Sequence, residues 1–79
     1  MNYELEKEKY VNKYVMFYPG DTYDKYGYIR DIDNLGYTYE VTHGRGSKGI
    51  YFCSHATKFT FELLDEKREM SIKKFYDKK

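Results

Sequence analysis

The feature of this sequence that most constrains its fold is an alternation of apolar and polar side chains in short runs, which clusters of turn residues separate. Alternation with a period of two indicates a strand with one buried face, because successive side chains of a strand point to opposite faces. The runs that show this pattern, or that are apolar almost throughout, are residues 14–18, 26–32, 37–42, 50–53 and 58–63. The sequence therefore predicts a mainly β protein with five short strands.

The segments on either side of these runs have helical character. Residues 3–13 are rich in Glu and Lys, which favour a short N-terminal helix or turn. In the C-terminal tail, residues 65–79, Glu69 and Lys73 form a favourable i,i+4 pair, whereas residues 70–72 also alternate as in a strand. The tail is therefore predicted to be helical, with an extended conformation as the alternative.

The length of 79 residues allows one small core, so we expect a single domain over residues 1–79. A hydrophobic fraction of 41% and an aromatic fraction of 20% are enough for a compact fold. The alternation assigns Ile29, Tyr37, Tyr39, Val41, Ile50 and Phe52 to the core, and it places Val15 with Phe17, and Phe59 with Phe61 and Leu63, on shared faces. By the same rule the side chains that point outward include Tyr26, Tyr28, Arg30 and Tyr51.

A sheet of five short strands in a domain this small must curl, because a flat sheet would leave long edges and one face exposed. The order of the runs from Tyr14 to Phe52, with Gly27 and Ile29 as a glycine and aliphatic pair, resembles an SH3-like β-barrel of the KOW or Tudor type over residues 13–64. An OB-like barrel is the alternative. The resemblance implies a non-catalytic binding module whose ligand, RNA, DNA or protein, lies across the loops or an exposed aromatic face.

The chain has eleven tyrosines and no tryptophan. A tyrosine ring suits a surface that is partly apolar and partly wet, since its hydroxyl keeps a hydrogen-bond partner. Outward Tyr26, Tyr28 and Tyr51 near Arg30 would suit the stacking of unpaired bases, and they would equally suit a protein partner. The alternative is that these rings cover the sheet or lie beneath the terminal segments.

Charge is nearly balanced, because 14 basic and 13 acidic residues give a net charge of +1. This argues against binding nucleic acid by bulk charge alone. Residues 43–60 nevertheless contain Arg45, Lys48 and Lys58 and no acid. Two of these cations lie in a G-x-G-x-x-G run, residues 44–49, which joins two predicted strands and so lacks the strand-to-helix context of a dinucleotide fingerprint. We expect a flexible hairpin loop, with a phosphate contact through Arg45 and Lys48 as the alternative.

Other motifs do not indicate catalysis or metal binding. Residues 31–36 imitate the start of a calcium loop, but Leu35 and Thr42 replace two of the required ligands, so a turn is expected. Cys53, His43 and His55 lack the paired spacing of a zinc site and any sign of a nucleophile with its base. The sequence therefore predicts no enzyme activity, no cofactor and no metal.

The lone cysteine cannot form an internal disulfide, and neither a signal-peptide core nor an apolar run of roughly 20 residues is present. We therefore expect a cytoplasmic protein without a membrane partner. The richness in Lys, Tyr, Glu and Asp resembles small proteins of low-GC Gram-positive bacteria and their phages. The predicted function is a small non-catalytic binding module for a protein or a single-stranded nucleic acid, with a KOW-like RNA- or DNA-binding module as the alternative.

Overall fold

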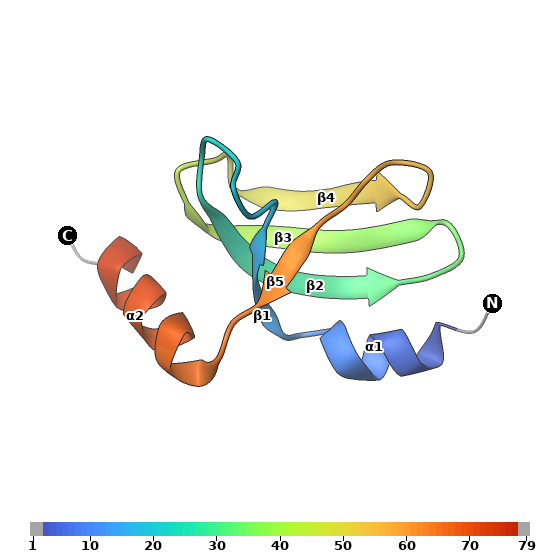
Figure 1. Ribbon diagram of the computed structural model, residues 1–79, viewed down its shortest axis with the longest axis horizontal. Helices are drawn as coiled ribbons and strands as arrows, with labels where there is room; N and C mark the ends of the chain where they lie inside the picture. The colour runs from blue at the N-terminus through green and yellow to red at the C-terminus, as the bar shows by residue number, and fades with distance from the viewer. Residues whose placement is uncertain (1–2, 78–79) are drawn as a thin grey trace.

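The computed structural model describes residues 3–77 and contains one five-stranded antiparallel sheet with a helix at each end of the chain (Figure 1). This confirms the prediction of a mainly β protein with a short N-terminal helix. Of the two conformations considered for the C-terminal tail, the structure shows the helix. The elements in chain order are α1 (Glu4–Tyr10), β1 (Tyr14–Phe17), β2 (Lys25–Ile32), β3 (Gly36–Gly44), β4 (Gly49–Ser54), β5 (Phe61–Leu63) and α2 (Glu66–Asp77).

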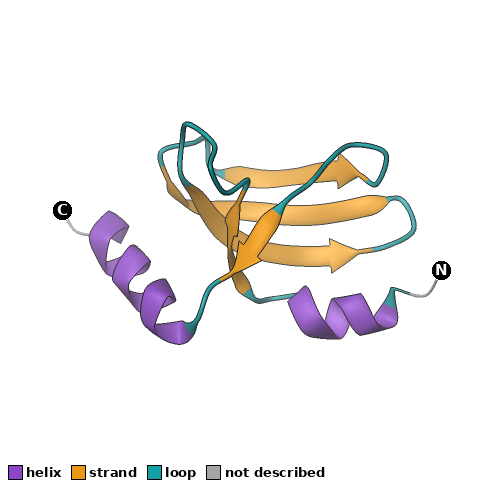
Figure 2. Cartoon of the chain, in the orientation of Figure 1, coloured by secondary structure: helices purple, strands orange, loops and turns teal. Residues whose placement is uncertain are grey.

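The strands are arranged in the order β4-β3-β2-β1-β5. β2, β3 and β4 lie side by side, while β1 and β5 cross them at one end of the sheet, and the helices lie beyond opposite ends (Figure 2). β1 pairs with β2 through Val15 opposite Gly27, and with β5 through Val15 opposite Leu63. The two ends of this order, β4 and β5, are therefore the edges of the sheet.

The ladder between β2 and β3 has two irregularities, one with an extra residue in β3 and one with an extra residue in β2. The pairing of β2 with β3 shifts between Tyr26 and Gly27 and again between Ile29 and Asp31. The second shift explains why Ile29 and Ile32, three positions apart, are both fully buried, although strict alternation would place them on opposite faces. At the first shift, a Cβ added to Gly27 would overlap the backbone carbonyl of Glu40, so only glycine fits this approach of the two strands.

The connections between strands follow from local turn chemistry. In the turn between β2 and β3, Asp33 Oδ1 accepts hydrogen bonds from the backbone N–H groups of Leu35 at 2.9 Å and Gly36 at 3.1 Å. These bonds lower the pKa of Asp33 below its ordinary value. The segment that imitates the start of a calcium loop therefore ends in a turn, as predicted. The loop between β3 and β4 is bounded by Gly44 and Gly49, which have φ of 121° and 144° and adopt a conformation that suits glycine.

The core lies between the inner face of the sheet and the segment that leads into β5. Its buried members are Val15, Phe17, Ile29, Ile32, Tyr39, Val41 and Cys53. Phe59, Phe61 and Tyr37 pack against this group, and so do Tyr3, Tyr10 and Val11 from the N-terminal segment. The predicted inner face of β3 is confirmed, and Val15 and Phe17 of β1 share a face, as predicted.

The predicted face of β4 is wrong. Ile50 and Phe52 were expected in the core, but their side chains are 70% and 56% exposed. Tyr51 and Cys53 point inward instead, because they lie directly opposite Tyr39 and Tyr37 of β3. Directly opposite residues of an antiparallel pair share a face, so the inner face of β3 determines that of β4.

No helix within residues 3–77 is long and apolar enough to cross a membrane.

Candidate functional site

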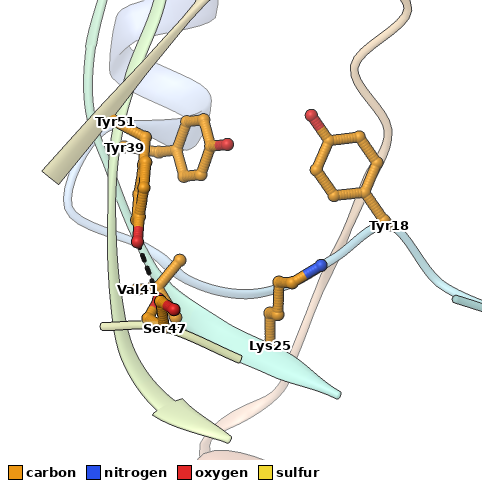
Figure 3. Close-up of a pocket in the computed structure, with 6 residues that line it drawn as sticks. All are labelled: Tyr18, Lys25, Tyr39, Val41, Ser47 and Tyr51. Atoms are coloured by element: carbon orange, nitrogen blue, oxygen red, sulfur yellow. Dashed lines mark hydrogen bonds between the residues drawn. The ribbon is translucent and has the colours of Figure 1, made fainter. Parts of the chain in front are cut away.

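A pocket of about 210 Å³ opens at the end of the sheet where the β1–β2 and β3–β4 loops meet. Figure 3 shows the rings of Tyr18 and Tyr39 on opposite sides of an open space, with the side chain of Lys25 reaching toward Tyr18. The residues that line it are Tyr18, Lys25, Tyr39, Val41, Ser47 and Tyr51. We call this group the tyrosine pocket.

One wall of the tyrosine pocket comes from paired positions of β3 and β4. Tyr39 and Tyr51 are directly opposite each other in the ladder, and their rings stack with centroids 5.7 Å apart and an interplanar angle of 28°. The Tyr51 hydroxyl donates a hydrogen bond of 3.0 Å to the backbone carbonyl of Ser47. This bond ties the β3–β4 loop to the edge strand and gives the wall a fixed shape.

Tyr18 forms the facing wall because the backbone turns at the end of β1. Its φ is 48°, in the left-handed region that bulky side chains rarely adopt. The ring packs edge-on against Phe59, with centroids 5.5 Å apart. Burial, followed by hydrogen bonding with Tyr39, raises the pKa of Tyr18 above its ordinary value. The hydroxyl therefore stays neutral and keeps its proton for donation at physiological pH.

Lys25 supplies the charge of the tyrosine pocket. Its Nζ atom lies 5.7 Å from the centroid of the Tyr18 ring and 2.9 Å from Oδ2 of Asp21. The hydrogen bond from Lys25 lowers the pKa of Asp21, so the Asp21 carboxyl group is ionised at neutral pH. The pocket thus combines aromatic walls with an ammonium group, an arrangement suited to holding a side chain or a base by stacking and by charge.

The β3–β4 loop brings two predicted binding residues to the rim of the tyrosine pocket. Arg45 and Lys48 are exposed and flank Ser47, one of the lining residues. The Arg45 backbone N–H donates to the carbonyl of Asp24 at 2.9 Å, which fastens the loop to the start of β2. Within residues 3–77, neither side chain forms an ion pair with a carboxylate.

The other predicted binding residues lie on the opposite face of the sheet, where α2 covers the tyrosines. Lys73 of α2 donates a hydrogen bond of 2.6 Å to the Tyr28 hydroxyl, and its Nζ atom lies 5.0 Å from the centroid of the Tyr14 ring. Tyr76 packs against Tyr26 with ring centroids 5.9 Å apart. Tyr26 and Tyr28 are therefore only partly exposed.

Arg30 lies on this outer face but is already engaged. Its guanidinium donates to Glu40 Oε1 at 2.6 Å and 2.9 Å and to the Asn12 side chain at 3.2 Å, and it lies 4.6 Å from the Tyr28 ring centroid. The six predicted binding residues therefore separate into two groups. Tyr51 lines the tyrosine pocket, and Arg45 and Lys48 lie in the loop that contributes Ser47 to it, whereas Tyr26, Tyr28 and Arg30 lie together beneath and beside α2.

The side chains that might have formed a metal or catalytic set are held apart by other partners. His43 contacts the Thr42 hydroxyl at 2.8 Å and Asp77 at 3.2 Å, while His55 contacts the Asp33 carbonyl oxygen at 2.6 Å. Cys53 is buried. Among residues 3–77, no three His, Cys, Asp or Glu side chains gather in a way that could hold a metal ion.

Sequence reasoning missed Tyr18, Lys25 and Ser47 as lining residues. Alternation places Tyr18 on the outer side with Tyr14, and only the left-handed backbone at residue 18 brings its ring to the inner side. The sequence did offer one signal for these residues. Tyr18 and Ser47 both belong to glycine-containing loops, and in a meander of consecutive antiparallel strands these two loops lie at the same end of the sheet. No family model matches this chain, and no curated protein or solved structure matches it.

Proposed function

We propose that this chain is a small non-catalytic binding module that recognises a protein partner at the tyrosine pocket. The observation that carries the proposal is the convergence of Tyr18, Tyr39 and Tyr51 with the Lys25 ammonium on one open pocket. Tyrosine is enriched among the residues that dominate binding energy at protein interfaces, because it buries a large rigid area and keeps a polar tip.

The size of the tyrosine pocket supports a binding role over a catalytic one. Pockets that enclose a small-molecule substrate or cofactor commonly have volumes of roughly 300–1,000 Å³. The tyrosine pocket, at about 210 Å³, is smaller and is open to solvent. A single side chain from a partner protein is an occupant of suitable size.

The strand order supports an SH3-like barrel as the framework for this function. β1 lies between β2 and β5, and a turn with a Thr57 N–H to Ser54 carbonyl hydrogen bond follows β4 before the chain returns to β1. In a barrel of the KOW or Tudor type, the ligand is expected across the loops, which is where the tyrosine pocket lies.

A single-stranded nucleic acid is the second candidate ligand. Arg45 and Lys48 at the rim of the pocket, beside stacked Tyr39 and Tyr51, favour this candidate, because aromatic rings and cations together suit bases and phosphates. The net charge of +1 supports it less well.

The proposal is tested by selecting binders from a display library of random peptides and measuring their affinities for pocket variants. We expect enriched peptides whose dissociation constants rise by about tenfold or more for Tyr51→Ala and for Lys25→Met, since each change removes a wall or the charge of the pocket. Tyr23→Ala is the matched control, because Tyr23 is an exposed tyrosine that lies outside the pocket.

Two results would contradict the proposal. Enriched peptides that bind wild type, Tyr51→Ala and Lys25→Met equally would place recognition elsewhere. Salt-dependent binding of single-stranded RNA or DNA, lost in the same two variants and unmatched by any peptide, would establish the second candidate.

A further inference from the structure

β4 presents an open hydrogen-bonding edge beside the tyrosine pocket. In the part of the chain that the structure describes, β4 pairs with β3 on one side only. Figure 1 shows no other strand beyond it. Every second residue of such an edge directs its N–H and C=O groups toward solvent, where another strand can bond to them.

The side chains of this edge do not block pairing. Proteins that protect an edge strand place charges or proline on it, but the centre of β4 is Ile50, Tyr51, Phe52 and Cys53. Ile50 and Phe52 are exposed on the outer face, and Tyr51 lies at the pocket on the inner face. An added strand would therefore find an apolar contact on one face and the pocket rim on the other.

The charges around β4 favour an acidic occupant. Arg45 and Lys48 precede the strand and Lys58 follows it, and within the described residues none of the three forms an ion pair with a carboxylate. Two of the nearby acids are paired, since Glu40, opposite Ile50, bonds to Arg30, and Asp21 bonds to Lys25. Two more acids lie near the ends of β4, because the backbone carbonyl of Asp24 accepts from Arg45 and that of Asp33 contacts His55. The edge is therefore uncharged along its length, with an excess of positive charge at the end where Arg45 and Lys48 lie.

A second copy of this chain fits the edge less well. If two β4 strands paired antiparallel about Tyr51, Lys48 of each copy would lie opposite Ser54 of the other, which places the Arg45–Lys48 end of one copy beside the His55–Lys58 end of the other. Arg45 and Lys48 would then face Lys58 as well as Asp33, so this pairing gains less from charge than pairing with an acidic segment does.

We propose that β4 binds an extended acidic segment of a partner polypeptide as a sixth strand of the sheet. Main-chain hydrogen bonds to β4 hold the segment, and Arg45 and Lys48 at the start of β4 select acidic side chains. Apolar residues of the segment contact Ile50 and Phe52. The inference rests on the proposed function in taking the ligand to be a protein, and it adds how the ligand binds and its charge.

The test uses a capped ten-residue peptide of alternating Val and Glu, and a second peptide with Lys in place of Glu. At low salt we expect the Glu peptide to bind about tenfold or more tightly than the Lys peptide and to slow amide exchange in β4. We further expect that N-methylation of one alternate set of peptide nitrogens abolishes binding, whereas methylation of the other set does not. In an antiparallel pair only alternate N–H groups of a strand point toward its neighbour, so only one of the two sets of peptide nitrogens can bond to β4.

Protein variants provide the matched comparison. Ile50→Glu and Phe52→Glu each place a like charge on the exposed edge and should weaken the Glu peptide by about tenfold or more. Met70→Glu is the control, because Met70 is 67% exposed on α2, which packs beside β2 and β3 and, within residues 3–77, not beside β4. Circular dichroism establishes that all three variants retain the sheet.

The inference is overturned by equal binding of the Glu and Lys peptides, by equal tolerance of both methylation patterns, or by amide protection outside β4. A dimer in sedimentation equilibrium that Phe52→Glu dissociates would assign the edge to a second copy, which also overturns it. Lys25→Met separates the two proposals. Suppose that library peptides lose affinity for Lys25→Met but do not slow amide exchange in β4 of the wild type; the pocket function then stands and strand addition fails. If instead the Glu peptide slows amide exchange in β4 of Lys25→Met as much as in the wild type, strand addition stands without the pocket.

Discussion

Tyr14 and Tyr28 lie side by side beneath α2, with ring centroids 5.3 Å apart, but their hydroxyls are in different situations. The Tyr28 hydroxyl accepts the hydrogen bond from Lys73. The Tyr14 hydroxyl is buried and has no hydrogen-bond partner among residues 3–77, and burial raises the pKa of this side chain above its ordinary value. A buried hydroxyl without a partner loses its hydration and gains nothing in return.

We therefore expect Tyr14→Phe to raise the free energy of unfolding by about 1 kcal/mol, because it removes the unsatisfied hydroxyl and keeps the ring. Tyr28→Phe is the matched variant and should lower it by about 1 kcal/mol, since the Lys73 ammonium then loses an acceptor. Urea denaturation followed by circular dichroism measures both. Equal destabilisation by the two variants would show that the Tyr14 hydroxyl has a partner in solution.

At the scale of elements, α2 is attached to the sheet by few side chains. None of its residues is fully buried, and it contacts the sheet through Lys73, Tyr76 and Asp77 and through an exposed ion pair of 2.9 Å between Arg68 and Glu62 of β5. Hydrogen bonds to Glu69 and then to Tyr28 raise the pKa of Lys73, so the ammonium is charged at neutral pH. The attachment of α2 therefore depends on a charged group that is partly accessible to water.

Lys73→Ala should speed amide hydrogen exchange in α2 by about tenfold or more, because it removes about 1–2 kcal/mol of charged hydrogen bonding and ring contact. Exchange in β2 and β3 should be unchanged. Lys74→Ala is the control, because Lys74 is exposed and its replacement by alanine changes the helix propensity by the same amount. Similar exchange rates in the two variants would show that other contacts hold the helix.

The elements could largely be predicted from the sequence, but the face of β4 could not. Ile50, Tyr51, Phe52 and Cys53 are all apolar or aromatic, so alternation marks no polar side of the strand. The choice is made by the register with β3, which places Tyr51 opposite Tyr39. That register depends on the conformation of the glycine-rich loop at residues 44–49, and the sequence leaves this conformation open. The tyrosine pocket depends on the inward position of Tyr51, which was missed for this reason, and on the left-handed backbone at Tyr18, which alternation does not predict.

For the whole molecule, stability depends on a single small core. Its largest fully buried side chains are Phe17, Ile29, Ile32 and Val15. A domain of this size has a total stability of about 4–12 kcal/mol, so the loss of one large core side chain is a considerable part of the total. The large apolar side chains outside the core, by contrast, contribute surface that a partner can cover.

We expect Phe17→Ala to lower the free energy of unfolding by about 3–5 kcal/mol, since it leaves a cavity among buried residues. Phe52→Ala, the same change at a side chain that is 56% exposed, should alter it by less than about 1 kcal/mol. Thermal denaturation distinguishes the two variants. Comparable losses would mean that Phe52 is covered in the free protein, which would also weaken the case for an open β4 edge.

Tyr18 is a position where folding and binding make different demands. The left-handed backbone there costs a bulky residue about 1 kcal/mol or more, which glycine would avoid and which asparagine bears more easily, as at Asn12 with its φ of 65°. The tyrosine ring is nevertheless one wall of the tyrosine pocket. In a library randomised at residue 18, selection for proteolytic resistance alone should admit glycine and asparagine beside aromatic residues, because the packing of the ring against Phe59 offsets the backbone cost, whereas selection for ligand capture should retain an aromatic ring alone.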